Sequence, residues 1–465
     1  MGAYLSDPVV EKNSRDEANR TLVSASSSMQ GWRVTQEDAH NMILDYDIDT
    51  SLFAVYDGHG GSEVAKYCSL KLPSFIKDTP AYIEGNIAQG LKDAFLRFDL
   101  HITDRRVVET LKMLADPESP LRIDESSDES DHDAVKDNVS DSENDIPNSQ
   151  EQQTNTETNT AENRVVPRVV TPPEVIESSN ESCDDRDNLN DTSDSSDSDD
   201  DEPDPEDKEF MANMIEEPGS DSGTTAVVAL ICGTELYVAN AGDSRCVLSR
   251  KGQAIDMSTD HKPEDEQEKA RIIKAGGRVT GDGRVNGGLN LSRAIGDHAY
   301  KQNKELPPAE QMITALPDIK KITLTDEDEF IVLACDGIWN FLSSQQAVDY
   351  IRSKYQDEKK LSRVIEKIFD HCLAPNSFGD GTGCDNMTAI IINLKDFIKK
   401  RQREIKMNTV QYDRRFSRRT AQSVNSSADA NPEVPTSNNS CKRSISPQSD
   451  SEEQDNKKIK SGDDR

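Results

Sequence analysis

Residues 51–61 read Ser-Leu-Phe-Ala-Val-Tyr-Asp-Gly-His-Gly-Gly, an apolar run that stops at an aspartate followed by glycines. The run is rich in aromatic and branched side chains, which predicts a buried strand, and Asp57-Gly58 predicts a tight turn at its end. Residues 62–76 then carry apolar side chains at helical spacing. The stretch therefore predicts a strand, a turn that presents a carboxylate, and a helix.

The same arrangement of an acidic residue at the end of an apolar run recurs along the chain. Its further members are Asp243, Asp336 and Asp385, and a separate acidic pair, Glu37-Asp38, follows Gly31-Trp32-Arg33. Each Asp-Gly alone is a common turn. Carboxylates at the ends of neighbouring strands can also converge on one cleft, and hard cations such as Mg²⁺ and Mn²⁺ prefer oxygen ligands. The repetition favours a metal site over a set of unrelated turns.

The remaining elements indicate a mixed α and β chain. Short β-rich runs at 224–231, 235–239 and 245–248 predict a meander of antiparallel strands, and 330–334 and 388–394 predict buried strands. Residues 266–275 and 343–355 have helical periodicity, and Ser343 is a plausible cap of the second helix.

Covalent catalysis is disfavoured by what the sequence lacks. It contains no phosphate-binding P-loop, no Cys-x5-Arg pattern and no recognisable Ser/His/Asp set. Cys335 precedes Asp336 within an apolar run, which predicts a buried and inert thiol. The chemistry is therefore expected to use water activated by metal ions.

Charge is concentrated in one segment of the chain. The 465 residues carry a net charge of −34, and residues 116–209 hold 32 Asp and Glu against 6 Lys and Arg. Such dense like charge with few apolar residues predicts a disordered insert. The insert is either a solvating loop or an electrostatic dock for basic partners such as histones or splicing factors. Direct binding of nucleic acid by the insert is disfavoured because phosphates would be repelled.

Taken together, the motifs resemble those of the metal-dependent protein phosphatase family, the type 2C phosphatases. They occur in family order and span residues 22–394 apart from the insert. Within the family, the chain is similar to the gamma-type members, which carry an acidic insert, in its first six residues, in the place and charge of the insert, and in Asn340, where many relatives have Asp. The matching stretches are 31–33, 37–40, 57–61, 222–226, 239–245, 260–263, 284–297, 335–339 and 385–388.

The resemblance implies an α+β fold: a four-layer α/β/β/α sandwich of two antiparallel sheets flanked by helices. It divides the chain into a first phosphatase part (22–115), the acidic insert (116–209), a second phosphatase part (210–394) and a basic, polar tail (395–465). The implied activity is hydrolysis of phosphoserine and phosphothreonine in proteins, with two Mn²⁺ or Mg²⁺ ions and a weaker third.

The resemblance also implies a role for each site residue. Asp57 would bridge the two ions, Asp336 and Asp385 would complete the first metal site, and Glu37 with the carbonyl of Gly58 would hold the second. Asp38 would hydrogen-bond waters on the metals, and Asp243 would help Asp336 to hold the third ion. Arg33 would clamp the substrate phosphate, because its planar fork matches phosphate oxygens. His59 would protonate the leaving oxygen, and Arg284 would contact substrate from a mobile flap.

The two ends of the chain carry signals for location. Met1-Gly2 through Ser6 fits the pattern of N-myristoylation with Gly2 as acceptor, which alone gives only weak membrane association. Basic clusters at 442–443 and 457–460 resemble a two-part nuclear import signal. We therefore expect a nuclear protein with some cytoplasmic pool.

Two other functions remain open from the sequence. In the first, the chain is an acidic histone-binding or splicing-factor-binding protein built on a phosphatase scaffold. In the second, it hydrolyses small phosphate esters. The complete set of carboxylates favours the phosphatase over the first, and the family resemblance favours protein substrates over the second.

Overall fold

Two antiparallel sheets packed face to face form the centre of the structure, a computed structural model that describes residues 4–116, 204–355, 357–403 and 406. The six-stranded sheet has the order β1 (Tyr4–Ala18), β2 (Val23–Arg33), β14 (Met387–Asn393), β13 (Asp328–Ala334), β9 (Arg245–Arg250) and β10 (Gln253–Asp256). The five-stranded sheet has the order β12 (Asp318–Thr323), β8 (Glu235–Ala241), β7 (Ala226–Cys232), β4 (Thr50–Tyr56) and β3 (Ala39–Asp47). A small third sheet contains β11 (Ile295–Gly296), β6 (Gly223–Thr224) and β5 (Gly58–His59).

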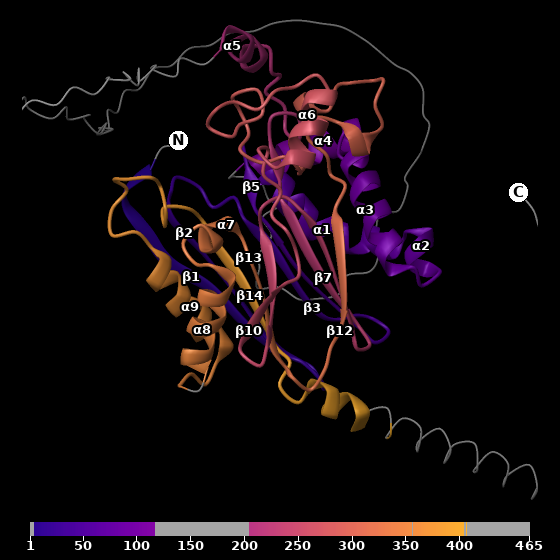
Figure 1. Ribbon diagram of the computed structural model, residues 1–465, viewed down its shortest axis with the longest axis vertical. Coiled ribbons are helices and arrows are strands. Elements are labelled where there is room, and N and C mark those ends of the chain that lie inside the picture. Colours follow the sequence, from indigo (N-terminus) through magenta and orange to yellow (C-terminus); the bar gives the residue numbers. More distant parts are fainter. Residues whose placement is uncertain (1–3, 117–203, 356, 404–405, 407–465) are drawn as a thin grey trace, which may run out of the picture.

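Helices cover the outer face of each large sheet (Figure 1). The five-stranded sheet is covered by α1 (Glu63–Lys77), α2 (Pro80–Ile83), α3 (Ile87–His101) and α4 (Arg105–Ala115). The six-stranded sheet is covered by α7 (Asp336–Trp339), α8 (Ser344–Tyr355) and α9 (Leu361–Cys372). Beyond one end of the sandwich lie α5 (Pro205–Ala212) and α6 (Glu266–Lys274), and two 3₁₀ turns occur at His298–Tyr300 and Pro308–Glu310.

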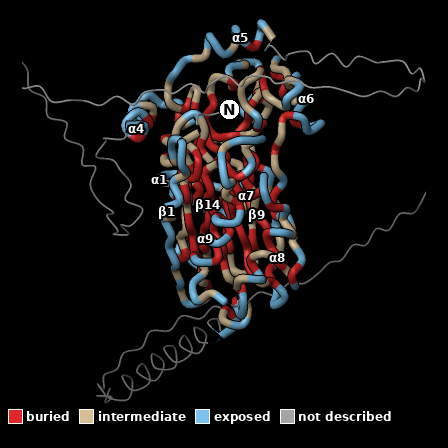
Figure 2. The backbone as a smooth tube through the Cα atoms, turned by 90° about the vertical axis from the view of Figure 1, so that its left-hand side faces the viewer, coloured by how far each residue is buried: buried red, intermediate tan, exposed pale blue. Residues whose placement is uncertain are grey.

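The alternation of side chains along β4 explains how the layers are held together. Phe53 and Val55 point between the two sheets, where they pack with residues of β9, β13 and β14. Leu52, Ala54 and Tyr56 point the other way, against α1 and α3. Because every second residue of a strand faces the same side, one apolar strand contributes to two cores. Figure 2 shows the resulting concentration of buried residues in the strands.

The predicted four-layer sandwich is therefore confirmed, with antiparallel pairing throughout the two large sheets. The predicted helices also form. The second begins after Ser343, whose hydroxyl accepts a hydrogen bond from the amide of Gln346 and whose own amide donates to the Gln346 side chain. This reciprocal pair is a helix cap of the expected kind.

Three segments extend the ordered fold beyond the boundaries predicted from sequence. Strand β1 pairs along β2, so the sheet starts at Tyr4 and not at Leu22. Helix α5 starts within the segment assigned to the insert, whose residues 117–203 lie outside the described chain. Residues 397–403 are helical and bury Phe397 at the end of the sandwich opposite α5, so the start of the predicted tail belongs to the fold (Figure 1).

No described helix has both the length and the apolar character needed to cross a membrane. The six cysteines in the described ranges are all free thiols. Cys335 is buried as expected, and burial raises the pKa of its thiol well above the usual value, with the charges of Asp38 and Asp57 adding to the effect.

Candidate active site

A cleft of about 440 Å³ opens at the end of the sandwich where β5 and α7 lie. Its walls include eight of the residues singled out from sequence, which come from loops and strand ends far apart in the chain. They are Arg33, Glu37, Asp57, Gly58, His59, Asp243, Asp336 and Asp385. Asp57 and Asp243 follow β4 and β8, Asp336 is the first residue of α7, and Glu37 and Asp385 lie in loops next to strands, so the two sheets bring the carboxylates to one edge.

The carboxylates at the base of the cleft crowd together. Oxygens of Asp57, Asp243 and Asp336 lie within 4.8 Å of one another, and Asp38, Asp57 and Cys335 form an overlapping group. Burial, reinforced by the neighbouring carboxylates, raises the pKa of Asp57 well above its usual value and that of Asp336 to about 8. Burial also raises the pKa of Asp38 to about 7. A cluster of this kind needs a compensating positive charge to stay ionised near neutral pH.

Asp38 lies beneath the cleft and is only 7% exposed. Neither of its carboxylate oxygens has a hydrogen-bond partner among the described residues, although both are buried. Gly58 lies beside the same region, where a side chain would not fit. A Cβ on Gly58 would come within 2.4 Å of the Glu37 carbonyl oxygen, so glycine is needed for this close approach of two backbones.

Arg33 extends from the end of β2 into the cleft. Its Nη2 donates to Asp385 Oδ2 at 2.6 Å, and its Nε is buried without a partner among the described residues. Burial lowers the pKa of the guanidinium, but the charge of Asp385 and the hydrogen bond more than offset this, so that it stays fully charged. A fixed cation is thus positioned next to the carboxylates, with one donor unused.

His59 is held by a carboxylate that the sequence analysis did not assign to the site. Its Nε2 lies 2.9 Å from both oxygens of Asp297, a side chain that is 1% exposed and 238 residues away in sequence. Burial lowers the pKa of His59, but the charge of Asp297 and its hydrogen bond outweigh burial and raise the pKa above 6.5. The pair therefore favours a protonated imidazole in the cleft.

The backbone around Asp297 is shaped for this contact. Asp297 adopts a left-handed conformation with φ of 53°, which is uncommon for a residue with a side chain. Gly223 lies against the carboxylate, and a Cβ there would come within 2.3 Å of Asp297 Oδ2. Asp297 stands last in the quoted stretch 284–297, but nothing in its local pattern indicates a histidine partner.

Asn386 is a second site residue missing from the sequence predictions. Its Oδ1 accepts a hydrogen bond from the amide of Glu37 at 2.9 Å, and its Nδ2 donates to the carbonyls of Gln30 and Thr35. It therefore fixes the loop that carries Arg33 and Glu37. Its place directly after Asp385 was the available signal. Asn340 similarly donates from Nδ2 to Asp336 Oδ2 at 2.9 Å.

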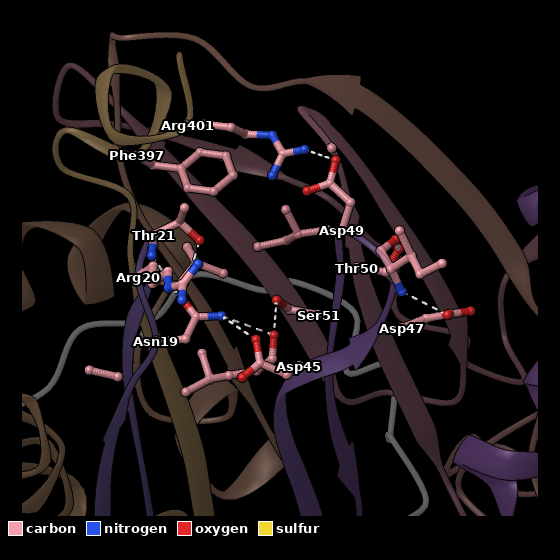
Figure 3. Close-up of a pocket in the computed structure, with 16 residues that line it drawn as sticks. Asn19, Arg20, Thr21, Asp45, Asp47, Asp49, Thr50, Ser51, Phe397 and Arg401 are labelled. Atoms are coloured by element: carbon pink, nitrogen blue, oxygen red, sulfur yellow. Dashed lines mark hydrogen bonds and ion pairs between the residues drawn. The ribbon is translucent and has the colours of Figure 1, made fainter. Parts of the chain in front are cut away.

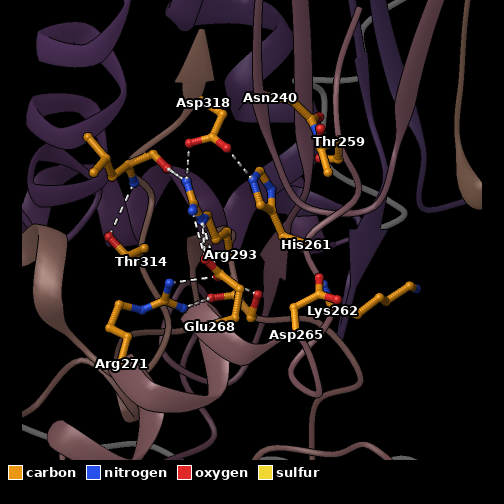
Figure 4. Close-up of polar contacts among 12 residues, drawn as sticks. Asn240, Thr259, His261, Lys262, Asp265, Glu268, Arg271, Arg293, Thr314 and Asp318 are labelled. Carbon is orange, nitrogen blue, oxygen red and sulfur yellow. Dashed lines mark hydrogen bonds and ion pairs between the residues drawn. The ribbon is translucent and has the colours of Figure 1, made fainter. Parts of the chain in front are cut away.

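The loops above the cleft are organised by a buried network of charges. Glu268 of α6 accepts hydrogen bonds from Arg271, Arg293 and Ser292, and Arg293 also contacts Asp318 (Figure 4). Burial raises the pKa of Glu268, but the two arginines outweigh it and lower the pKa to about 2. The network anchors the segment that runs from Asp260 to Leu291, which includes the predicted flap.

Arg284, predicted to contact substrate, lies in that segment but is engaged locally. Its Nη1 donates to the Gly288 carbonyl at 2.6 Å, and its Nε pairs with Asp282 at 3.2 Å. The part of the flap that lines the cleft is instead 289–291. Gly2, the predicted lipid acceptor, falls outside the described residues.

A second and larger cavity, of about 910 Å³, lies at the opposite end of the sandwich (Figure 3). Its lining includes Asn19, Arg20, Asp45, Asp49 and Arg401. Arg401 is ion-paired with Asp49, and Asn19 donates to Asp45. None of the residues predicted as catalytic or metal-binding lines this cavity.

Comparison with known proteins yields a family and several relatives. A family described as "Protein phosphatase 2C" matches residues 22–115 and 127–380. "Protein phosphatase 1G" of Mus musculus is 43% identical, over 85% of this chain and 93% of the mouse protein. A "probable protein phosphatase" of Drosophila melanogaster is 39% identical, over 88% of this chain and 87% of its own.

A solved structure supports the architecture. The crystal structure of a phosphatase from a pathogenic strain of Toxoplasma gondii matches with a TM-score of 0.50 at 18% identity. The match covers 82% of this chain and 95% of the other. At this identity the likeness concerns the fold alone.

Proposed function

The chain belongs to the protein phosphatase 2C family and is a protein serine/threonine phosphatase, and from this premise we propose how its cleft works. The family is metal-dependent. We infer that the cleft holds two Mn²⁺ or Mg²⁺ ions and hydrolyses phosphoserine and phosphothreonine by direct attack of water. The observation that carries the proposal is the convergence of Arg33, His59 and the carboxylates on one cleft.

The acidic residues fit a pair of hard divalent cations. Asp57 lies between the other carboxylates and is shared by both groups of potential ligands. Asp336 and Asp385 on one side, and Glu37 with the Gly58 carbonyl on the other, would complete the two sites. The unpartnered oxygens of Asp38 would accept hydrogen bonds from bound waters. When bound, the two ions would supply a water of lowered pKa as the nucleophile.

Arg33 would bind the phosphate oxygens and orient the ester for attack. Its Nε is a buried donor without a protein acceptor, and such a donor costs about 1–3 kcal/mol. An oxygen of the substrate that accepts from Nε would remove this cost. The hydrogen bond to Asp385 fixes the direction of the guanidinium, so that little rotational freedom is lost on binding.

His59 would donate a proton to the departing serine or threonine oxygen. Asp297 keeps the imidazole charged and holds its Nε2 side, which leaves Nδ1 as the ring nitrogen that can face substrate. The leaving alkoxide is strongly basic, so a positioned acid is worth about 10²–10⁴ in rate.

The test is phosphate release from a phosphothreonine peptide by the full chain, with Mn²⁺ or with a chelator. We expect release that requires metal and falls by several orders of magnitude in Asp57→Asn. Asp370→Asn removes an exposed carboxylate far from the cleft and serves as the matched control. If clean, folded wild type released no phosphate at any Mn²⁺ or Mg²⁺ level, the proposed mechanism would be rejected.

We also propose that the acidic insert recruits basic phosphoproteins, such as histones or splicing factors, to the cleft. The support is charge complementarity, because residues 116–209 carry most of the negative charge of the chain. The alternative is that the insert is itself the functional part, in a binding protein with a phosphatase scaffold. Partner capture that is lost with the insert but kept in Asp57→Asn would establish recruitment independent of catalysis.

Location is a separate proposal. The basic clusters at 442–443 and 457–460 support a mainly nuclear pool, and the Gly2 motif supports weak membrane association of a cytoplasmic fraction. Imaging of the full chain tests both. Replacing Lys457, Lys458 and Lys460 should move protein to the cytoplasm, and Gly2→Ala should abolish any myristate label.

A further inference from the structure

Lys262 reaches into the carboxylate cluster from the start of the flap. Its Nζ lies 2.5 Å from Asp243 Oδ2, and the Asp243 side chain is only 5% exposed. Oxygens of Asp243 lie within 4.8 Å of those of Asp57 and Asp336. The ammonium group therefore sits on the side of the cluster where the sequence analysis placed a third cation.

The backbone fixes Lys262 in this position. His261, the preceding residue, donates from its amide to the Gly242 carbonyl at 3.1 Å, and its Nδ1 lies 3.2 Å from the Gly242 amide. Gly242 in turn directly precedes Asp243. The amide of Lys262 also donates to Asp265 Oδ2 at 3.2 Å. Figure 4 shows Lys262 beside His261 and Asp265, with its side chain directed away from the Glu268 network.

Three cationic side chains near the carboxylate cluster each pair with one carboxylate. Arg33 pairs with Asp385, His59 pairs with Asp297, and Lys262 pairs with Asp243. Arg33 and His59 approach the cluster from the β2 and β5 sides, and Lys262 approaches from the flap. An ion on Asp243 would have to share this carboxylate with an ammonium at hydrogen-bonding distance. A divalent cation on Asp243 Oδ2 would be repelled by an ammonium at this distance.

We propose that Lys262 is a built-in competitor for the divalent cation at Asp243, so that a third ion binds only when the Lys262 side chain leaves. The inference rests on the metal centre of the proposed function. The weaker third ion that the family resemblance implies would then be explained by the Lys262 ammonium, and the ligands themselves need not be poor. Occupancy of Asp243 would also be coupled to the flap, because Lys262 lies at the root of the segment that ends in 289–291.

The experiment is an equilibrium Mn²⁺ titration of the full chain, in which free Mn²⁺ is followed by electron paramagnetic resonance. Lys262→Met removes the charge and keeps the length of the side chain. A fixed charge at this distance changes the cation affinity of a carboxylate by about tenfold or more. We expect the weakest Mn²⁺ site of Lys262→Met to tighten by about tenfold, and Lys262→Arg to remain as weak as wild type.

Two controls isolate the contact. Lys274→Met removes the same charge from α6, where Lys274 forms an exposed ion pair with Glu310, and should leave all Mn²⁺ affinities unchanged. Asp243→Asn should remove the weak site, and Lys262→Met should then have no further effect, because the two residues act through one interaction. Circular dichroism of each variant in chelator establishes that it is folded.

The outcomes separate this inference from the proposed function. An unchanged or weaker third site in folded Lys262→Met, with the two tight sites intact, would overturn the role of Lys262 alone. A wild type that binds no Mn²⁺ would overturn the metal centre itself. A tighter third site that persists in the Asp243→Asn background would show a general charge effect and would also reject the competition.

Discussion

The protonation state of His59, which pairs with Asp297, should make the activity depend on pH. Because Asp297 raises the pKa of His59, the imidazole keeps its proton at a higher pH than a free histidine would. In the proposed mechanism His59 acts as a general acid in its protonated form, so activity should decline as pH rises through its pKa. Removing the charge of Asp297 should lower that pKa.

We therefore expect Asp297→Asn to shift the alkaline limb of the kcat profile to lower pH. Asparagine tolerates the left-handed backbone at this position, so the fold should survive. Above neutral pH the loss should approach the contribution of a general acid, about 10²–10⁴. The measurement is kcat against pH at saturating Mn²⁺.

Asp318→Asn is the matched control for this profile, since Asp318 also pairs with a histidine, His261, but lies outside the cleft lining. Its alkaline limb should coincide with that of wild type. An Asp297→Asn profile of wild-type shape, merely scaled down, would show that Asp297 has only a structural role.

The buried carboxylates make a second prediction about pH, now for stability. The pKa values of Asp38, about 7, and Asp336, about 8, lie above the ordinary value of 3.8. Without metal, the folded state therefore binds more protons than the unfolded state at pH values between the ordinary and the raised pKa, from about 4 to about 8. Its free energy of unfolding should fall as pH rises from about 4 to 8, by about 1.4 kcal/mol for each pH unit and each excess proton.

Urea denaturation in chelator at several pH values tests this slope. Asp336→Asn should flatten it, whereas Asp370→Asn should not. Saturating Mn²⁺ should reverse the trend, because metal binding requires the deprotonated carboxylates and strengthens as pH rises. A slope in chelator that Asp336→Asn leaves unchanged would contradict the assignment of the protons to the cluster.

Asp57, Asp243 and Asp336 could be predicted from sequence because each follows a recognisable apolar strand, whereas Asp385 precedes one. Asp297 and Asn386 could not, because their roles depend on contacts between segments 238 and 349 residues apart. A buried aspartate and a loop asparagine have no local pattern that names a distant partner. Lys262 was likewise recognised from sequence only as part of the motif at 260–263, and its ion pair with Asp243 could not be predicted.

At the scale of elements, the apolar strands were predicted and the polar ones were not. Strand β1 is mostly exposed and contains Pro8, so it lacks the alternation that identifies a strand. It forms because β2 offers it a free edge, and Pro is tolerated in such an edge strand. The three two-residue strands around the cleft are too short to have a sequence pattern that predicts them.

The first residues of α5, 205–209, were assigned to the insert because their composition is acidic. The structure shows why the helix is nevertheless held: Arg278 binds both Asp204 and Asp207, and the Phe210 ring packs 5.0 Å from that of Tyr300. Its local signals were present, since Asp204 caps the helix and Pro205 occupies the first turn. The charge of the neighbouring residues concealed them.

We expect Arg278→Ala to release α5 from the flap. Asp207, which is 4% exposed, would lose its partner, and trypsin should then cut after Lys208 several-fold faster than in wild type. Mass spectrometry of the early fragments identifies the cut. Lys274→Met, which breaks an exposed ion pair on α6, should not change the rate at Lys208. Equal rates in all three proteins would mean that α5 is held by its apolar contacts alone.

At the scale of the whole molecule, the anchoring of α4 and α5 determines where the insert leaves the fold. Helix α4 ends at Ala115 and contacts the segment after α5 through Lys112 and Glu217, 2.9 Å apart. Both ends of the insert are therefore attached at the end of the sandwich that carries the flap (Figure 1). The net charge of residues 116–209 is −26, within a total of −34. We therefore propose that the negative charge of the insert acts on basic substrates that approach the cleft.

Replacing residues 117–203 by a Gly/Ser linker of about 20 residues, which spans about 25 Å on average, isolates this effect. The carboxylates and the cleft are unchanged, so kcat for a short neutral phosphothreonine peptide should remain at the wild-type value. For an arginine-rich phosphoprotein, loss of the field should raise KM by about tenfold or more at low ionic strength. The salt dependence of KM should fall in parallel, because exposed charges are screened within about 10 Å at 0.1 M salt.

An insert of the same composition in scrambled order is the matched control. If charge alone recruits the substrate, the scrambled chain should keep the wild-type KM and its salt dependence. If it instead behaves like the linker variant, recruitment depends on a specific sequence within the insert, and the electrostatic account is incomplete. If KM for the basic phosphoprotein is the same in all three chains, recruitment by the insert is wrong, and substrate choice must reside in the cleft and the flap.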